Sequence, residues 1–223
     1  MKAKSERVMS QIALLIVVSI LIQGCATAQL SKGPDTYALI EHQESAAFGI
    51  PKAMDERKGE NAGTIGGALI KVKKKDLVEL ATNYLVQYIN QKVGLNVVRI
   101  TMSESEPAEV IMAKHNVDGI VVLKIKELKM FSMDALLQPV KTDLTLELMI
   151  LDKSGRAIYE RTVTGHDEKR IGVSMVEKSA GKIVETVVKD ALSQLVKDPE
   201  LRKIIARFKW GKLSKVLKIP FWG

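Results

Sequence analysis

The stretch KTDLTLELMILDKSGRAIYERTVT, residues 141–164, decides the fold class of this 223-residue chain. Its first half alternates apolar and polar residues with a period of two, as in a strand with one covered and one exposed face. Residues 152–155, DKSG, then provide a tight connection with glycine where a positive φ is needed. The stretch therefore predicts an antiparallel hairpin of strands 141–151 and 156–164.

Outward from this hairpin, apolar segments predict the rest of a sheet. A long strand is expected at 120–130, and its alternation slips near Glu127, which indicates a β-bulge. Shorter strands are expected at 45–51 and 96–101, and an irregular one within a Gly-rich, charged loop near 64–65.

Two segments carry apolar stripes at helical spacing, 76–93 and 174–196. Each opens with an acid or hydroxyl residue followed three positions later by glutamate, as in a capping box: Asp76 with Glu79 and Ser174 with Glu177. A short helix is also expected at 107–116. The predicted fold is therefore α/β (α+β), with a mixed, largely antiparallel sheet covered by two long helices.

The N-terminus has the features of a bacterial lipoprotein signal. Three basic residues precede an apolar run, 12–22, which is shorter than the ~20 residues that a bilayer span needs. Ile22-Gln23-Gly24-Cys25 then resembles a lipobox, and Cys25 is the single cysteine of the chain. We expect residues 1–24 to be removed and Cys25 to carry a lipid such as palmitate. The alternative is a buried free thiol behind an uncleaved helix.

The formal net charge of +8 is unevenly distributed. Residues 25–196 hold 23 basic and 23 acidic side chains, whereas residues 197–223 hold eight basic and two acidic ones. A neutral body with a cationic tail excludes a nucleic-acid-binding domain. The expected organisation is a signal peptide at 1–24, a polar tether at 25–43, a folded domain at 44–196 and a basic amphipathic tail at 197–223.

The tail has an apolar face, a cationic face and tryptophans near its end. This composition is typical of a helix that lies on an anionic membrane surface. The same pattern also fits a helix that packs its apolar face on the domain, and amphipathicity alone does not separate the two. The residues expected to contact a membrane or an envelope protein are Leu201, Arg202, Ile204, Ile205, Arg207, Phe208, Trp210 and Trp222.

Catalytic and metal-binding motifs are not evident in the sequence. The three histidines, His42, His115 and His166, have no second ligand at metal-site spacing, although His115 suits a helix C-terminus. The glycines of residues 63–67 lack the Gly-Lys-Ser/Thr of a phosphate loop, so a flexible loop is expected there. Asp55 and Arg57 are expected to form a weak surface salt bridge, and the alternative is a pair that pins a loop or a partner. We therefore expect no enzymatic activity, cofactor or metal ion.

Short motifs add a resemblance to a known family: the lipobox, Phe48-Gly49-Ile50, Gly63-Thr64-Ile65-Gly66 and Asp118-Gly119-Ile120 ahead of the long hairpin. Together they resemble YajG-type bacterial lipoproteins, which look like distant relatives of the curli-secretion lipoprotein. The resemblance implies an outer-membrane lipoprotein facing the periplasm, and Ala26 after the cysteine fits, because aspartate there is the usual inner-membrane signal. It supplies no catalytic residues.

Two functions follow as expectations. The first is a non-enzymatic binding or assembly module of the cell envelope, anchored in the lipid bilayer through acylated Cys25. The second is an accessory lipoprotein of an envelope transport or secretion system that handles an apolar ligand or lipid. A buried apolar pocket would favour the second function.

Overall fold

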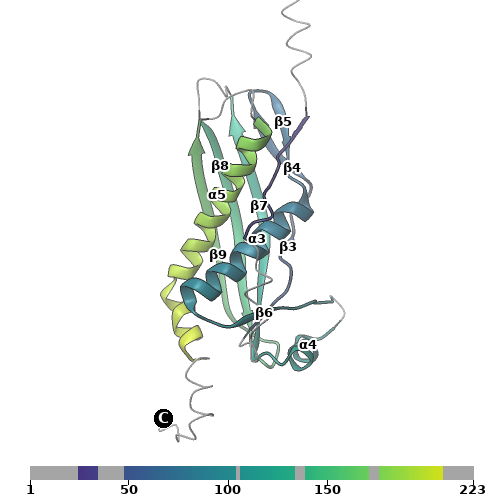
Figure 1. The fold of residues 1–223 in the computed structure, drawn as a ribbon, viewed down its shortest axis with the longest axis vertical. Helices are drawn as coiled ribbons and strands as arrows, with labels where there is room; N and C mark the ends of the chain where they lie inside the picture. The colour runs from purple at the N-terminus through teal and green to yellow at the C-terminus, as the bar shows by residue number, and fades with distance from the viewer. Residues whose placement is uncertain (1–24, 35–47, 104–105, 134–138, 171–175, 208–223) are drawn as a thin grey trace, which may run out of the picture.

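The computed structural model describes residues 25–34, 48–103, 106–133, 139–170 and 176–207. Within these residues the strands form one nine-stranded sheet around the long strand β7 (Gly119–Ser132). On one side of β7 lie the antiparallel strands β8 (Val140–Leu151) and β9 (Ala157–Lys169) (Figure 1). This is the predicted hairpin. The predicted bulge is confirmed as well, because the β7–β8 register shifts between Ile125 and Glu127.

On its other side, β7 pairs with three short strands that follow one another along its length. These are β2 (Phe48–Ile50), β3 (Met54–Asp55) and β4 (Asn61–Ile65), and all three run parallel to β7. Further out, β6 (Val97–Arg99) pairs with β2 at one end of the sheet. At the other end, β5 (Ala68–Lys71) pairs with β4, and β1 (Cys25–Thr27) with β5. The fold class is thus the predicted one, a mixed and largely antiparallel sheet with helices.

Two helices lie on one face of this sheet (Figure 1). Helix α3 (Lys74–Tyr88) ends in a π-helical turn, η1 (Ile89–Val93), and Gly94 follows in the left-handed conformation that suits a helix end. Helix α5 (Val176–Lys197) is followed by a short helix at 199–207. The predicted cap at Asp76 is wrong, since α3 begins at Lys74, whose N–H donates to the Glu60 carboxylate at 3.1 Å. The predicted cap Ser174 lies outside the described residues.

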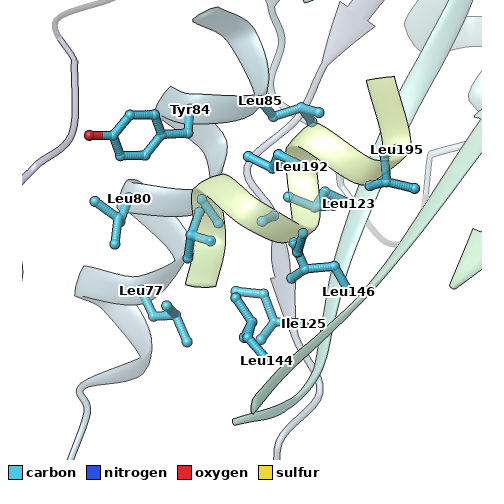
Figure 2. Close-up of a cluster of buried hydrophobic side chains, with 14 of the residues drawn as sticks. Leu77, Leu80, Tyr84, Leu85, Leu123, Ile125, Leu144, Leu146, Leu192 and Leu195 are labelled. Carbon is cyan, nitrogen blue, oxygen red and sulfur yellow. The ribbon is translucent and has the colours of Figure 1, made fainter. Parts of the chain in front are cut away.

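The main core fills the space between the sheet and these helices (Figure 2). Leucines of α3 and α5 pack on the inward residues of β7 and β8, which are Leu123, Ile125, Leu144 and Leu146. Leu146 is fully buried, as its alternation predicts, because every second residue of β8 faces the helices.

The other face of the sheet, which we call the open face, is covered at one end by α4 (Ala108–His115). A smaller apolar cluster that includes Ile111, Met112 and Ile120 lies beneath α4. His115 ends this helix, as the sequence predicts. In the middle of the open face, the outward residues of β7 and β8 include Lys124, Lys126 and Glu147.

Candidate functional site

Cys25, the expected lipid attachment site, is the first residue of edge strand β1 and is exposed. It pairs with Leu69 of β5, and the N–H of Ala28 donates to the Lys71 carbonyl at 2.8 Å. The alternative of a buried thiol is therefore wrong. The exposed sulfur lies at an end of the sheet, which we call the Cys25 end.

The residues after β1 are also packed on the body. Ala28 is buried, the N–H of Gln29 donates to the Glu177 carbonyl at 3.3 Å, and the side chain of Asn83 donates to the Lys32 carbonyl. A Cβ added at Gly181 of α5 would lie 1.9 Å from the Gln29 carbonyl oxygen. The expected tether at 25–43 is therefore wrong for residues 25–32, and residues 35–43 lie outside the described residues. The folded body begins at Cys25 itself.

A cluster of four charged side chains occupies the middle of the open face. Lys124 lies 2.9 Å from Glu147, and Lys126 lies 2.5 Å from Glu56 and 3.5 Å from Glu147. Hydrogen bonds from the lysines lower the pKa of both glutamates, from Lys126 for Glu56 and from Lys124 for Glu147. The same bonds raise the pKa of both lysines. All four groups thus stay charged at neutral pH.

A depression of the open face adjoins this cluster, between the β3–β4 connection and β7. Its lining includes Lys58, Asn61, Gly63 and Lys129, together with Glu56 and Lys126 of the charged cluster. Gly63 has a φ of 131°, and a Cβ there would lie 1.9 Å from the Met130 carbonyl oxygen, so glycine is required where β4 meets β7. The depression therefore lies where the backbones of β4 and β7 approach each other closely.

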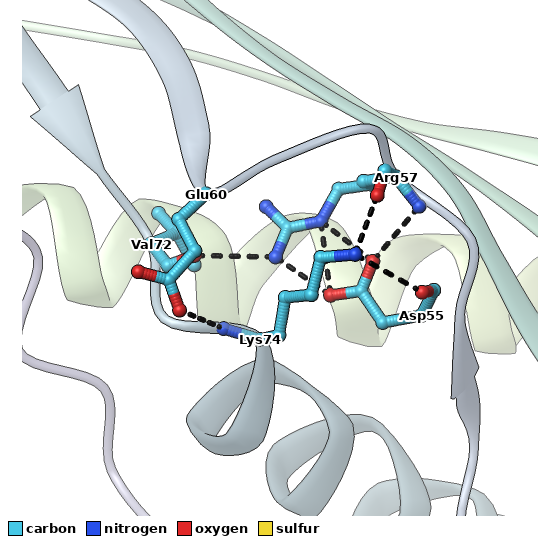
Figure 3. A network of polar contacts seen from close by, with 5 residues as sticks. All are labelled: Asp55, Arg57, Glu60, Val72 and Lys74. Atoms are coloured by element: carbon cyan, nitrogen blue, oxygen red, sulfur yellow. Dashed lines mark hydrogen bonds and ion pairs between the residues drawn. The ribbon is translucent and has the colours of Figure 1, made fainter.

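The Asp55–Arg57 pair is buried, which corrects the expected surface salt bridge (Figure 3). The side chains are 4% and 5% exposed, and the guanidinium donates to both carboxylate oxygens at 2.7–3.1 Å. Arg57 also donates to the Val72 carbonyl at 3.2 Å, and Lys74 donates to the Arg57 carbonyl at 2.5 Å. The pair therefore fastens the connection after β3 to the start of α3, and its role is structural.

The first part of the basic tail belongs to the body. Leu201, Ile204 and Ile205 are 3%, 9% and 5% exposed and lie in the main core. The expected membrane or partner contact through these three residues is therefore wrong in this conformation, and the expected domain boundary at 196 is too early. Tyr159 supports the packing, because its hydroxyl donates to Asp198 at 3.0 Å.

The remaining expected contact residues of the tail divide into two groups. Arg202 and Arg207 are exposed, and Arg202 donates to the Val196 carbonyl at 3.1 Å. Phe208, Trp210 and Trp222 lie outside the described residues. Helix α5 starts beside Gln29 and runs 22 residues, about 33 Å at 1.5 Å per residue, away from the Cys25 end. The helix at 199–207, yellow in Figure 1, therefore lies at the opposite end of the body from β5, the partner of β1.

The core beneath residues 199–207 contains one narrow apolar gap. It is lined only by apolar side chains, and its volume is about 10 Å³. This volume has room for about one water molecule. The gap therefore offers an apolar ligand no space in this conformation.

The described residues provide no further chemical centre of the expected kinds. They hold no group of three or more His, Cys, Asp or Glu side chains suited to a metal ion. His166 lies on the open face with its Nδ1 2.6 Å from Asp143, and His42 lies outside the described residues. Among the helices that the structure describes, none is both long and apolar enough to cross a membrane.

No family model matches the sequence, and no curated protein matches it. Among solved structures, protein XCC0632 from Xanthomonas campestris, described with the DUF330 family, has a TM-score of 0.48 and 11% identity, covering 82% of this chain and 94% of that one. Lipoprotein GNA1162 from Neisseria meningitidis has a TM-score of 0.36 and 9% identity, covering 69% and 99%. A minor lipoprotein from Acinetobacter baumannii has a TM-score of 0.38 and 15% identity, covering 71% and 93%. Two of these three are named as lipoproteins, and the resemblance to the YajG type stays a prediction.

Proposed function

We propose that this chain is an outer-membrane lipoprotein, facing the periplasm, that serves as a non-enzymatic binding or assembly module of the cell envelope. The observation that carries the proposal is the place of Cys25, exposed at the first residue of an edge strand directly after the signal-like segment. An acyl chain on this sulfur enters a bilayer without displacing any part of the core. Because no tether separates Cys25 from the sheet, the body then lies directly on the bilayer.

The charged cluster of the open face supports a role without catalysis. A general acid or base works best when its pKa lies near the working pH. Glu56 and Glu147 have lowered pKa values, and Lys124 and Lys126 have raised ones, so all four move away from neutrality. These side chains suit a fixed pattern of charge that a polar partner recognises.

The depression beside the cluster is the partner site in this proposal. Lys58 and Lys129 are exposed at its rim, where Lys129 lies 2.8 Å from Glu127, and Gly63 lies where β4 approaches β7 closely. A polar segment of another envelope protein, with acidic side chains for these lysines, is the partner that this surface fits.

The basic tail is a second candidate for contact with a partner. Residues 208–223 include four lysines, and they follow the helix at 199–207, which comes after α5, a helix that runs about 33 Å away from the Cys25 end. This place in the fold favours an arm for an anionic partner over a second contact with the anchoring bilayer. The accessory that handles an apolar ligand is the less favoured function, because the apolar gap in the core beneath residues 199–207 has a volume of about 10 Å³.

Site-specific photo-crosslinking in intact cells tests the binding role. A photoreactive residue at Lys58 of the acylated full chain should give a discrete crosslinked product. The same residue at Lys182, exposed on α5 over the covered face, is the matched control and should not give that product. Identical products from both positions, or none from Lys58, would contradict a partner site on the open face. Membrane fractionation tests the location, since the wild type should sediment with outer membranes and Cys25→Ala should not.

A further inference from the structure

Among the described residues, the two most exposed large apolar side chains lie at the Cys25 end. Met133 is 75% exposed and Phe131 is 55% exposed. Phe131 is the penultimate residue of β7, and Met133 follows the last one. The remaining exposed large apolar residues, Val110 on α4 and Ile158 at the start of β9, lie toward the opposite end of the sheet.

The strand register places Phe131 level with Cys25. Cys25 pairs with Leu69, Leu69 with Thr64, and Thr64 with Phe131, so the four residues form one row across four strands. Directly paired residues present their side chains on the same face of a sheet. Adjacent strands are ~4.8 Å apart, so three steps separate Cys25 from Phe131 by about 14 Å along the open face.

Among the described residues of this end, the apolar side chains form a thin rim. Along β7, the next residue on the open face is Lys129, two positions before Phe131, which is about 7 Å at 3.3 Å per residue. Lys71 lies at a similar depth, two positions beyond Leu69 on β5. A shallow apolar edge backed by charged side chains has the dimensions of a surface that enters the headgroup boundary of a bilayer by ~5–10 Å.

We propose that Leu69, Phe131 and Met133 form a bilayer-contacting rim that holds the body end-on, with its strands directed away from the membrane. The inference rests on the proposed acylation of Cys25, because the acyl chain fixes which end meets the lipid. The occupant is the bilayer that receives that chain, since an acylated Cys25 brings the lipid surface within about 14 Å of Phe131. In this orientation α4, the 152–155 turn and the point where the tail departs face the periplasm.

Spin-label accessibility on acylated full-length protein in phosphatidylethanolamine–phosphatidylglycerol vesicles tests the rim. Acylation occupies the thiol of Cys25, so Met133→Cys and Val110→Cys each offer one labelling site. The Met133→Cys label should collide several-fold more with oxygen, which concentrates in lipid, than with a water-soluble nickel chelate. The Val110→Cys label, on an equally apolar parent residue at the opposite end, should show the reverse ratio.

The outcomes separate this inference from the acylation on which it rests. If mass spectrometry shows acylated protein and both labels report water, the rim is wrong while the anchor stands. Protection of the Met133→Cys label from nickel without a gain in oxygen collisions indicates contact with a second copy, and this also overturns the rim. Absence of acylation on Cys25 overturns both proposals.

Discussion

Replacing Gly181 by alanine tests whether the chain after Cys25 packs on α5. Alanine in a helix interior is favoured over glycine by about 0.5–1 kcal/mol, so the helix considered alone gains stability. The new Cβ, however, would lie 1.9 Å from the Gln29 carbonyl oxygen, and this contact with backbone forces residues 28–30 away. The two effects have opposite signs, which makes the substitution decisive.

The loss of unfolding free energy can be worked out from the contacts of residues 28–30. Its displacement breaks the bond from Ala28 to Lys71 and the bond from Gln29 to Glu177. Each is worth about 0.5–1.5 kcal/mol. Exposure of the Ala28 methyl group adds about 0.8 kcal/mol. After the helix gain is subtracted, Gly181→Ala should lower the free energy of unfolding by about 1–3 kcal/mol.

Urea unfolding of the unacylated chain from Cys25 onward, followed by circular dichroism, measures this change. The matched control is the same substitution in a chain that starts at Gly33, where the obstructing carbonyl is absent and alanine should stabilise by about 0.5–1 kcal/mol. If the substitution stabilised both chains by the same amount, residues 28–30 would not pack on α5 and the segment after Cys25 would be a free tether.

Three further predictions concern the rest of the body. Leu201→Ala should lower the free energy of unfolding in urea by about 2–5 kcal/mol, whereas Lys203→Ala, at an exposed position nearby, should change it by less than about 0.5 kcal/mol. Equal effects would show that Leu201 is not part of the core. Asp55→Asn should lower the free energy of unfolding by about 3–5 kcal/mol, because it leaves the buried Arg57 without its ionic partner. The double variant Asp55→Leu with Arg57→Met should lose much less. A smaller loss for Asp55→Asn than for the double variant would contradict the burial of the pair. The hydrogen bond from Lys124 lowers the pKa of Glu147 below 4.5, so ionised Glu147 stabilises the fold above that pH and this contribution is lost as the pH falls. Glu147→Gln should therefore lose less unfolding free energy than wild type between about pH 7 and about pH 3. Equal losses in the two proteins would contradict the pairing.

The sequence predicts those parts of the fold whose patterns are local. Strand β8 alternates strictly, β7 is a long apolar run with one slip in its alternation, and α5 carries a regular apolar stripe. The type of each element therefore follows from residues within a few positions of one another. Strands β1 and β5 are missed because they are only three and four residues long and lie toward the edge of the sheet. They are too short to show a period, and their pairing joins residues some 44 positions apart.

The burial of Asp55 and Arg57 is beyond local reasoning for a similar reason. An acid and a base two positions apart have the composition of a solvated turn. What buries them is the start of α3, through the Val72 carbonyl and Lys74, which are distant in sequence. One signal was available for the N-terminal segment: Gly181, a glycine inside an otherwise regular helix, indicates close approach by another part of the chain.

The tail shows where a pattern is ambiguous in principle. An apolar stripe backed by cations satisfies a bilayer or a protein core equally well. Leu201, Ile204 and Ile205 belong to the core because residues 199–207 form a helix directly after α5, with apolar side chains beside Leu192 and Leu195. This packing depends on the space left between the helices and the sheet, which the tail sequence does not encode.

The central claim is that an acylated Cys25 is the first residue of the folded body. Intact mass spectrometry of the protein extracted from membranes measures this directly. The predicted result is a chain that begins at Cys25 and carries the added mass of acyl groups, with no acylated species from Cys25→Ala. A membrane-extracted chain that begins at Met1, or one with an unmodified Cys25, would contradict the account.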